Sequence, residues 1–317
     1  MAQHPPEIAV IIPTRQRETR LAFALDALAE QTLASDRFEV IVVRDSDAHP
    51  PLACAPAGLR ARFMTNSGVS GPTAKRNLGW RATSAKLVAF TDDDCRPSPD
   101  WLDRLLREAG GPDVFLQGRT EPDPDERHRQ TLFDRSREIT APSDWYPACN
   151  IAYPRALLES LDGFDEAFWF GGEDTDLGLR ARADGARLAY VPDALVWHAV
   201  LVRSLPDALR DASRWPSLPL VVARHPSQRR AVYGRFFWKR SHASLLVAAA
   251  GTLMWRRSRL VAASAALPYL KQSLDLTQLT PRRTLRQLIH LPARALVDAV
   301  EIVATARAAI RHRVFLV

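Results

Sequence analysis

The stretch that decides the fold is LVAFTDDDCRPSPDWL, residues 87–102. An apolar run of four residues opens it, and Asp92, Asp93 and Asp94 follow after a single threonine. Adjacent carboxylates repel one another, and Asp is disfavoured in strands. A buried strand that ends in three carboxylates therefore indicates a site where a divalent cation such as Mg²⁺ or Mn²⁺ offsets the repulsion. The alternative is a solvated acidic turn that caps the next helix.

The residues around this stretch alternate between short apolar runs and helical patterns. The expected strands are 8–12, 38–43, 63–64, 87–90 and 114–116, and the expected helices are 18–32, 73–81 and 99–109. This alternation is typical of an α/β fold, with a mostly parallel sheet and helices on both faces. Ligands of such folds bind beyond the carboxyl ends of the strands, which is where the three carboxylates lie.

A second acidic stretch is FWFGGEDTDLG, residues 168–178. Its two glycines allow a tight turn, and Glu173 and Asp174 then open a helix. Acidic residues in a first helical turn are often only partners of the helix dipole. Dipole pairing does not account for the glycine pair or for the aromatic run Phe168-Trp169-Phe170. A partly buried carboxylate beside an aromatic wall suits a general base.

Two further features are weak when taken alone. His198 ends the apolar run Ala194-Leu195-Val196-Trp197, and it is either structural or a ligand of the same metal. The stretch NSGVSGPTAKRNLGW, residues 66–80, predicts an anion-binding turn at the start of a helix. It is not a P-loop, because the glycine, lysine and serine or threonine spacing of that motif is missing.

Composition sets the outer limits. The 317 residues suffice for one large domain or two ordinary ones, and 46% of them are hydrophobic. The 3 cysteines are scattered, with no C-x-x-C pair, which argues against a disulfide scaffold and against a zinc site of that type. The N-terminus lacks the basic region and the long apolar run of a signal peptide, so we expect the catalytic part to face the cytoplasm.

Charge divides the chain unevenly. Residues 1–198 hold 23 basic and 31 acidic side chains, a net charge of −8, whereas residues 199–317 hold 20 and 5, a net charge of +15. A strongly basic segment binds nucleic acid or an anionic membrane surface. No nucleic-acid-binding motif occurs, so we expect no nucleic-acid partner.

The basic region also contains two apolar runs, 243–255 and 260–270, on either side of Arg256-Arg257-Ser258-Arg259. Each is shorter than the roughly 20 residues that a spanning helix needs. They predict either a shallow hairpin whose arginines reach lipid headgroups or an ordinary helical subdomain packed on the catalytic domain. The amphipathic pattern of residues 284–313, with aromatic and basic residues nearby, favours the membrane surface.

Taken together and in order, these motifs resemble those of a family 2 glycosyltransferase with the GT-A fold. The resemblance runs from residue 7 to residue 200 or so. It rests on VIIPTRQR, VVRDSD, GPTAKRNLG, FTDDDCRPSPDWL, CNIAYPRALLESLDGFDE and GGEDTDLGLRARADGARLAYVPDALVWH. It implies a GT-A catalytic domain over residues 1–203. The charge and the apolar pattern described above indicate a basic, amphipathic helical region over 204–317. The implied activity is a metal-dependent, inverting transfer of a sugar from a nucleotide-sugar donor to an acceptor hydroxyl.

The resemblance also implies roles for individual residues. Asp174 is the expected catalytic base, with Glu173 beside it. The expected ligands of Mg²⁺ or Mn²⁺ are Asp92, Asp94 and His198. The residues expected to bind the nucleotide-sugar are Pro13, Thr14, Arg17, Asp45, Lys75, Arg76, Asp92 and Asp93, with Asp47 as the alternative to Asp45. The residues expected at the acceptor are Asn150, Trp169, Gly171 and Gly172.

The expected acceptor is a cell-envelope or lipid-linked glycan, reached from the inner face of the cell membrane by a peripherally attached enzyme. Two other classes stay open. A nucleotidyltransferase on a similar sheet would use a similar metal site and release pyrophosphate instead of a nucleoside diphosphate. A non-catalytic glycan- or membrane-binding scaffold would keep the fold alone.

Overall fold

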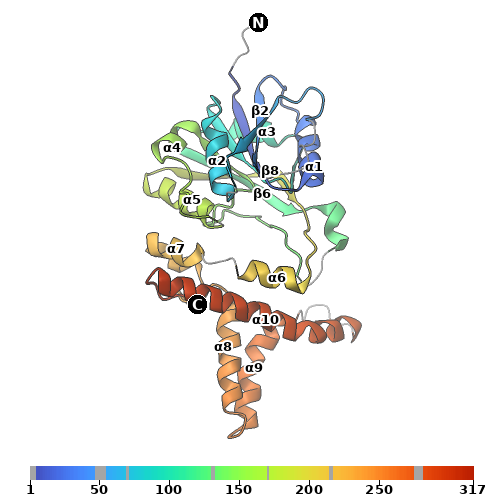
Figure 1. Ribbon diagram of the computed structural model, residues 1–317, viewed down its shortest axis with the longest axis vertical. Helices are drawn as coiled ribbons and strands as arrows, with labels where there is room; N and C mark the ends of the chain where they lie inside the picture. The colour runs from blue at the N-terminus through green and yellow to red at the C-terminus, as the bar shows by residue number, and fades with distance from the viewer. Residues whose placement is uncertain are drawn as a thin grey trace. The chain divides into compact units, whose positions relative to one another are not determined.

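The structure is a computed structural model, and it describes residues 5–46, 55–68, 71–129, 133–169, 171–213, 217–274 and 281–317. Asp47 and Phe170, which the sequence analysis considered, lie outside the described residues. Contacts between residues divide the chain into two compact units, an N-terminal unit, Met1–Val202, and a C-terminal unit, Arg203–Val317. The N-terminal unit contains the sheet, and the C-terminal unit is helical (Figure 1).

Within the described residues, the N-terminal unit forms a sheet of eight strands in the order β3-β2-β1-β4-β7-β6-β8-β5. The strands are β1 Ile8–Thr14, β2 Phe38–Asp45, β3 Ala61–Asn66, β4 Leu87–Phe90, β5 Cys95–Pro97, β6 Val114–Pro122, β7 Ile151–Pro154 and β8 Arg187–His198. The helices are α1 Glu18–Ala29, α2 Pro72–Arg81, α3 Trp101–Glu108, α4 Arg155–Ser160 and α5 Glu173–Ala183, with a 3₁₀ helix at Pro124–Arg129.

Strand direction explains where the polar residues gather. The strands β3, β2, β1 and β4 are parallel, β7 is antiparallel to both β4 and β6, and β6 is parallel to β8. Six strands therefore share one direction, and their carboxyl ends meet at one edge of the sheet. The polar residues that end strands there, or follow them, are Thr14, Asp45, Asp92, Asp93, Asp94 and His198.

The sheet is mixed but, in the part of the chain that the structure describes, mostly of one strand direction, which confirms the mostly parallel α/β sheet that the sequence predicts. The two antiparallel strands, β5 and β7, are three and four residues long. Strand β5 has the sequence Cys95-Arg96-Pro97 and pairs with β8. Its proline is more typical of a turn than of a strand. Their pairing depends on partners that are distant in sequence, so neither strand gives a local signal.

Both faces of the sheet are buried, which is why β1 is apolar along most of its length. Ile8, Val10 and Ile12 face α1 and α3, whereas Ala9 and Ile11 face α2, α4 and α5. Figure 1 shows the two groups of helices on opposite sides of the sheet. An unbroken apolar run is the pattern expected of a strand covered on both faces.

One close approach positions the strand ends. The pairing of β6 with β8 shifts register after Gly118, and a Cβ there would lie 2.4 Å from the carbonyl oxygen of Ala194. The fully buried amide of Asn150 fills this irregularity. Its Nδ2 donates to the carbonyls of Arg119 at 2.8 Å and Ala194 at 2.9 Å, and its Oδ1 accepts from Trp101 at 2.9 Å. The structure therefore uses Asn150 inside the protein rather than at an acceptor surface.

The C-terminal unit consists of α6 Leu205–Ala212, α7 Ser217–Arg224, a 3₁₀ helix at Pro226–Ala231, α8 Arg240–Leu253, α9 Arg259–Ser273 and α10 Pro281–Arg311. The helices α8 and α9, which contain the two apolar runs, lie side by side as a hairpin (Figure 1). In the part of the chain that the structure describes, no helix combines the length and the hydropathy needed to cross a membrane.

Candidate active site

Two groups of hydrogen bonds and ion pairs lie at the carboxyl edge of the sheet, and Arg76 is at the centre of the first. The Arg76 guanidinium donates to Glu173 Oε1 and to Asp92 Oδ1, each at 2.8 Å, and it lies 5.7 Å from the centre of the Phe164 ring. Burial disfavours its charge, but Asp92 and Glu173 outweigh burial and raise the pKa of Arg76 above its ordinary value. Arg76 thus joins the end of β4 to the start of α5 from its place in α2.

A second group of contacts holds the other two aspartates. Thr14 donates to Asp93 Oδ2 at 2.7 Å, and Arg17 donates to Asp93 Oδ1 at 3.1 Å and to Asp94 Oδ2 at 2.7 Å. Burial raises the pKa of Asp93 to about 6, although Arg17 opposes the rise. The repulsion between three consecutive carboxylates is offset because Arg76 pairs with Asp92 and Arg17 pairs with Asp93 and Asp94.

Asp94 and His198 form the part of the site that fits a divalent cation. His198 Nδ1 lies 2.9 Å from the carbonyl oxygen of Ala199, which can only accept a hydrogen bond. In the neutral ring Nδ1 therefore carries the hydrogen, and Nε2 has a free lone pair. Nε2 lies 3.7 Å from Asp94 Oδ1, too far for a hydrogen bond between them. Two lone-pair donors that face one another across this distance suit a shared cation.

Cys95 lies in the same group, and sequence reasoning missed it. Among the described residues, one donor atom each of Asp94, Cys95 and His198 lie within 4.8 Å of one another. Burial raises the pKa of the Cys95 thiol well above its usual range, so the sulfur stays protonated. A protonated thiol is a poor ligand, and Mg²⁺ and Mn²⁺ prefer oxygen donors to sulfur. Cys95 lies opposite His198 because β5 pairs with β8, and no local sequence pattern predicts that pairing.

Asp174 has the surroundings of a general base. Its Oδ1 accepts from the backbone N–H of Thr175 at 2.8 Å, and its Oδ2 accepts from that of Ala148 at 3.2 Å. Burial raises the pKa of Asp174 above its ordinary value, against the opposing charge of Arg76. Burial and the neighbouring Asp174 also raise the pKa of Glu173, to about 7. Asp174 is the less buried of the two and the more accessible to a substrate.

The loop before α5 is fixed to the start of α2. Thr73 donates to the carbonyl of Phe168 at 2.6 Å, and a Cβ on Gly71 would lie 1.9 Å from the carbonyl oxygen of Trp169. Gly171 and Gly172 follow with φ of 80° and 85°, which only glycine adopts at low cost. Trp169 is 63% exposed, so the loop that precedes Glu173 and Asp174 presents a large aromatic side chain to solvent.

Asp45 forms the remaining part of the site. It is fully buried, its Oδ2 accepts from Lys75 Nζ at 3.0 Å, and Arg15 Nε lies 3.6 Å from the same oxygen. Pro13 is buried within β1. Arg15 was not among the predicted residues. The family resemblance implies a role for Arg17, and no local pattern distinguishes Arg15.

Arg137 is a further cation that sequence reasoning missed. Its charge lowers the pKa of Asp92 and opposes the rise in the pKa of Asp174, in both cases as a smaller contribution than burial and Arg76. It comes from residues 133–145, which contain no regular helix or strand. A single arginine in such a polar stretch carries no local sign of its place in the fold.

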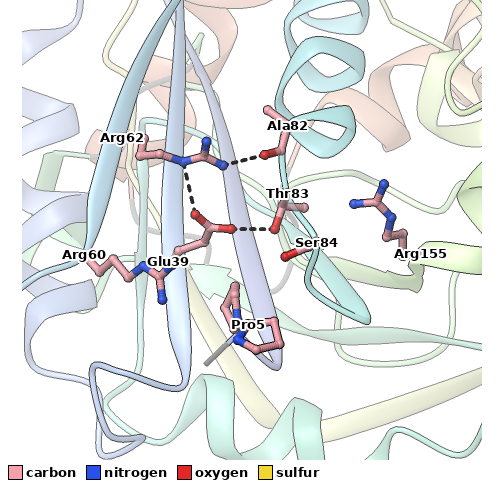
Figure 2. A pocket seen from close by; sticks show the side chains of 9 residues that line it. Pro5, Glu39, Arg60, Arg62, Ala82, Thr83, Ser84 and Arg155 are labelled. Atoms are coloured by element: carbon pink, nitrogen blue, oxygen red, sulfur yellow. Dashed lines mark hydrogen bonds and ion pairs between the residues drawn. The ribbon is translucent and has the colours of Figure 1, made fainter. Parts of the chain in front are cut away.

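A separate polar hollow lies at the amino ends of the strands, away from this site (Figure 2). Glu39 lies within it, accepting from Thr83 Oγ1 at 2.6 Å and pairing with Arg62 Nε at 3.1 Å. Arg62 also donates to the carbonyl of Ala82 at 2.6 Å. These contacts tie the end of α2 to β2 and β3, and we assign them a structural role.

Comparisons with other proteins agree with this description. Residues 9–161 match the family model "Glycosyl transferase family 2". The validoxylamine A glucosyltransferase of Streptomyces hygroscopicus subsp. limoneus is 29% identical over 222 residues, which cover 57% of this chain. The pre-mycofactocin glycosyltransferase of Mycobacterium tuberculosis is 28% identical over 237 residues, which cover 70% of this chain. The matches span 49% of each relative, so the chain covers about half the length of these proteins.

The fold comparison points the same way. The mannosyltransferase PcManGT from Pyrobaculum calidifontis, solved in complex with GDP-Man and Mn²⁺, superposes with a TM-score of 0.61 and 19% identity. The superposition covers 96% of this chain and 87% of that one. At this identity the likeness shows the fold alone, and it confirms the GT-A-like mixed sheet flanked by helices. The family match and these glycosyltransferase relatives place residues 9–161 of the chain in glycosyl transferase family 2.

Proposed function

We propose that this protein is a metal-dependent, inverting glycosyltransferase that moves a sugar from a nucleotide-sugar donor to a hydroxyl of a cell-envelope or lipid-linked glycan. The single observation that supports this best is the buried contact set in which Arg76 joins Asp92 to Glu173. It ties the carboxylates proposed for the donor and metal to the helix that carries the proposed base, Asp174.

The donor half of the site is assigned to the ends of β1, β2 and β4. Asp45, held by Lys75, is the proposed contact of the nucleotide base, and Thr14 and Asp93 lie on the ribose side. Because Arg17 and Arg76 are already paired with carboxylates, Arg137 is the cation that we assign to the diphosphate. PcManGT, whose fold is similar, was solved with GDP-Man, which supports a nucleotide-sugar donor here.

Asp94 and His198, with Asp92 nearby in the sequence, are the proposed ligands of the divalent cation. The carboxylate oxygens fit Mg²⁺ or Mn²⁺, the imidazole of His198 offers a further nitrogen donor, and PcManGT was solved with Mn²⁺. When bound, such a cation stabilises negative charge on the departing nucleoside diphosphate.

Asp174 is the proposed base. It accepts the proton of the acceptor hydroxyl, whose oxygen attacks the anomeric carbon as the bond to the diphosphate breaks. One displacement of this kind inverts the anomeric centre. Two backbone N–H groups hold the carboxylate in place, and its raised pKa brings it closer to the working pH of a base. Trp169, Gly171 and Gly172 border the acceptor in this proposal, and Asn150 only supports the strands.

The C-terminal unit is the proposed site of peripheral contact with a membrane, at its inner face. Residues 199–317 carry 20 basic and 5 acidic side chains, which suits an anionic lipid surface. A lipid-linked acceptor would then be presented at the same surface.

The test is to identify the product. The full chain is incubated with a panel of nucleotide-sugars and Mn²⁺, with a membrane extract as acceptor source, and the released phosphates are separated by chromatography. We expect one donor to yield its nucleoside diphosphate, and Asp174→Asn to lose that product. Pyrophosphate as the only product would establish a nucleotidyltransferase instead, and no product from any donor would support a scaffold.

A further inference from the structure

The hairpin of α8 and α9 buries small residues and exposes large apolar ones. Gly251 and Ala262 are buried between the helices, and a Cβ on Gly251 would lie 2.4 Å from the Cβ of Ala265. By contrast, Leu253 is 78% exposed and Leu260 is 77% exposed. A water-soluble hairpin buries its large apolar side chains and leaves small or polar ones outside. The reverse order is how helices pack in lipid.

The apolar side chains are densest at the turn between the two helices. Trp255 there is 55% exposed and Val261 is 51% exposed. Arg256, Arg257 and Arg259 lie among them and are also exposed, and the Arg259 guanidinium lies 5.9 Å from the centre of the Trp255 ring. Residues 240–274 contain no Asp or Glu. Tryptophan and arginine together are typical of the interface between lipid tails and headgroups.

The opposite end of the hairpin is polar and fixed to α10. His242 Nε2 and Lys239 Nζ contact Glu301 Oε2 at 3.1 Å and 2.6 Å. Tyr269 donates to Asp298 at 3.0 Å. The hairpin is therefore held at one end by buried and partly buried hydrogen bonds and ion pairs, and its apolar turn lies at the other end (Figure 1).

We propose that the turn of this hairpin, residues 253–261, inserts into the surface of an anionic lipid bilayer. The 14 residues of α8 and 15 residues of α9 make helices of roughly 21 to 23 Å, shorter than the hydrocarbon core of about 30 Å. The turn thus enters one leaflet, with its arginines on lipid phosphates. This inference rests on the proposed membrane contact of the C-terminal unit and names the element that makes it. The positive charge around the apolar turn favours anionic lipid over the hairpin of a second copy, which carries the same positive charge.

The test is flotation of the full chain with vesicles of phosphatidylcholine alone or with phosphatidylserine added. One variant replaces Trp255 and Leu260 by Glu, and another replaces Arg256, Arg257 and Arg259 by Gln. The matched control is Phe23→Glu in α1, where a large apolar side chain is 53% exposed in the other unit. Melting curves and nucleotide binding show that each variant is folded.

We expect wild type and the control to float with the anionic vesicles. The triple Gln variant should bind roughly 100-fold more weakly, since each arginine near the surface contributes about five-fold. The double Glu variant should fail to float. If wild type floats and both turn variants float equally well, the hairpin inference is overturned while the membrane contact stands. If wild type does not float, the hairpin inference and the proposed membrane contact both fail, and the proposal of glycosyl transfer is unaffected. Dimers formed without lipid that the turn variants abolish would assign the turn to a second copy.

Discussion

The two units depart from ordinary burial in opposite directions. In the N-terminal unit charged side chains are inside, with Arg76 and Glu173 each 4% exposed. In the C-terminal unit large apolar side chains are outside, with Leu253 78% exposed. Burying a charge and exposing a large apolar side chain both cost free energy in water. Each of these features therefore indicates a surface that meets something other than water. The first suits a polar ligand held away from solvent, and the second suits a lipid surface.

The largest expected effect is on turnover, through Asp174. If this carboxylate takes the proton of the acceptor, Asp174→Asn should lower kcat by about 10³-fold while nucleoside diphosphate binding stays the same. Asp184→Asn is the matched control, because Asp184 is exposed at the other end of the same helix. Transfer rates for both variants decide the point, and unchanged transfer by Asp174→Asn would remove it from the mechanism.

The next effect concerns the buried charges themselves. Arg76→Met should lower the free energy of unfolding by about 3–5 kcal/mol, because it leaves Asp92 and Glu173 buried without their cation. Arg81→Met on the same helix removes a surface pair with Asp162 and should cost about 0–1 kcal/mol. Urea unfolding of the two variants measures the contrast. Equal losses would mean that the buried pairs contribute no more than the surface pair.

The raised pKa of Glu173 predicts how stability changes with pH. Between its ordinary value of 4.5 and about 7, the folded protein holds a proton that the unfolded chain has released. The free energy of unfolding should therefore fall as pH rises through this window, by about 2 kcal/mol from pH 5 to 7. Glu173→Gln should flatten this dependence. A stability that rises with pH over the same range in wild type would contradict the burial argument.

The smallest effect concerns the packing of the hairpin. Gly251→Val should push α8 away from α9 and destabilise the protein by about 1 kcal/mol more than Ala250→Val, whose side chain is exposed on the same helix. Melting curves of both variants measure the difference. If the two variants have the same melting temperature, the close contact of Gly251 with Ala265 does not contribute to stability.

The sequence predicts the helices and strands of each unit better than it predicts which distant side chains contact one another. The apolar runs and the acidic strand end place β1, β2, β4 and the three aspartates correctly. The contact of Arg76 with Glu173 joins residues 97 positions apart, and no local pattern announces it. Asn150 is an instructive case, since its motif suggests a ligand contact whereas the register shift at Gly118 uses its amide inside the sheet.

The hairpin shows the same limit in the other unit. Its two apolar runs predict paired helices, and the arginines between them predict the turn. Which side chains lie inside is decided by the close approach at Gly251, because only small residues fit between helices at that distance. The periodicity of an Ala-rich helix does not reveal that choice.

The most direct test of the central claim is a thermal shift experiment with UDP, GDP, dTDP and CDP, each with and without Mn²⁺, on wild type and Asp94→Asn. A ligand that binds only the folded state raises the melting temperature. We predict that one nucleotide stabilises wild type only when Mn²⁺ is present, and that Asp94→Asn loses this metal-dependent rise. A rise that is the same without metal, or that persists in Asp94→Asn, would contradict a metal-held diphosphate at this edge of the sheet.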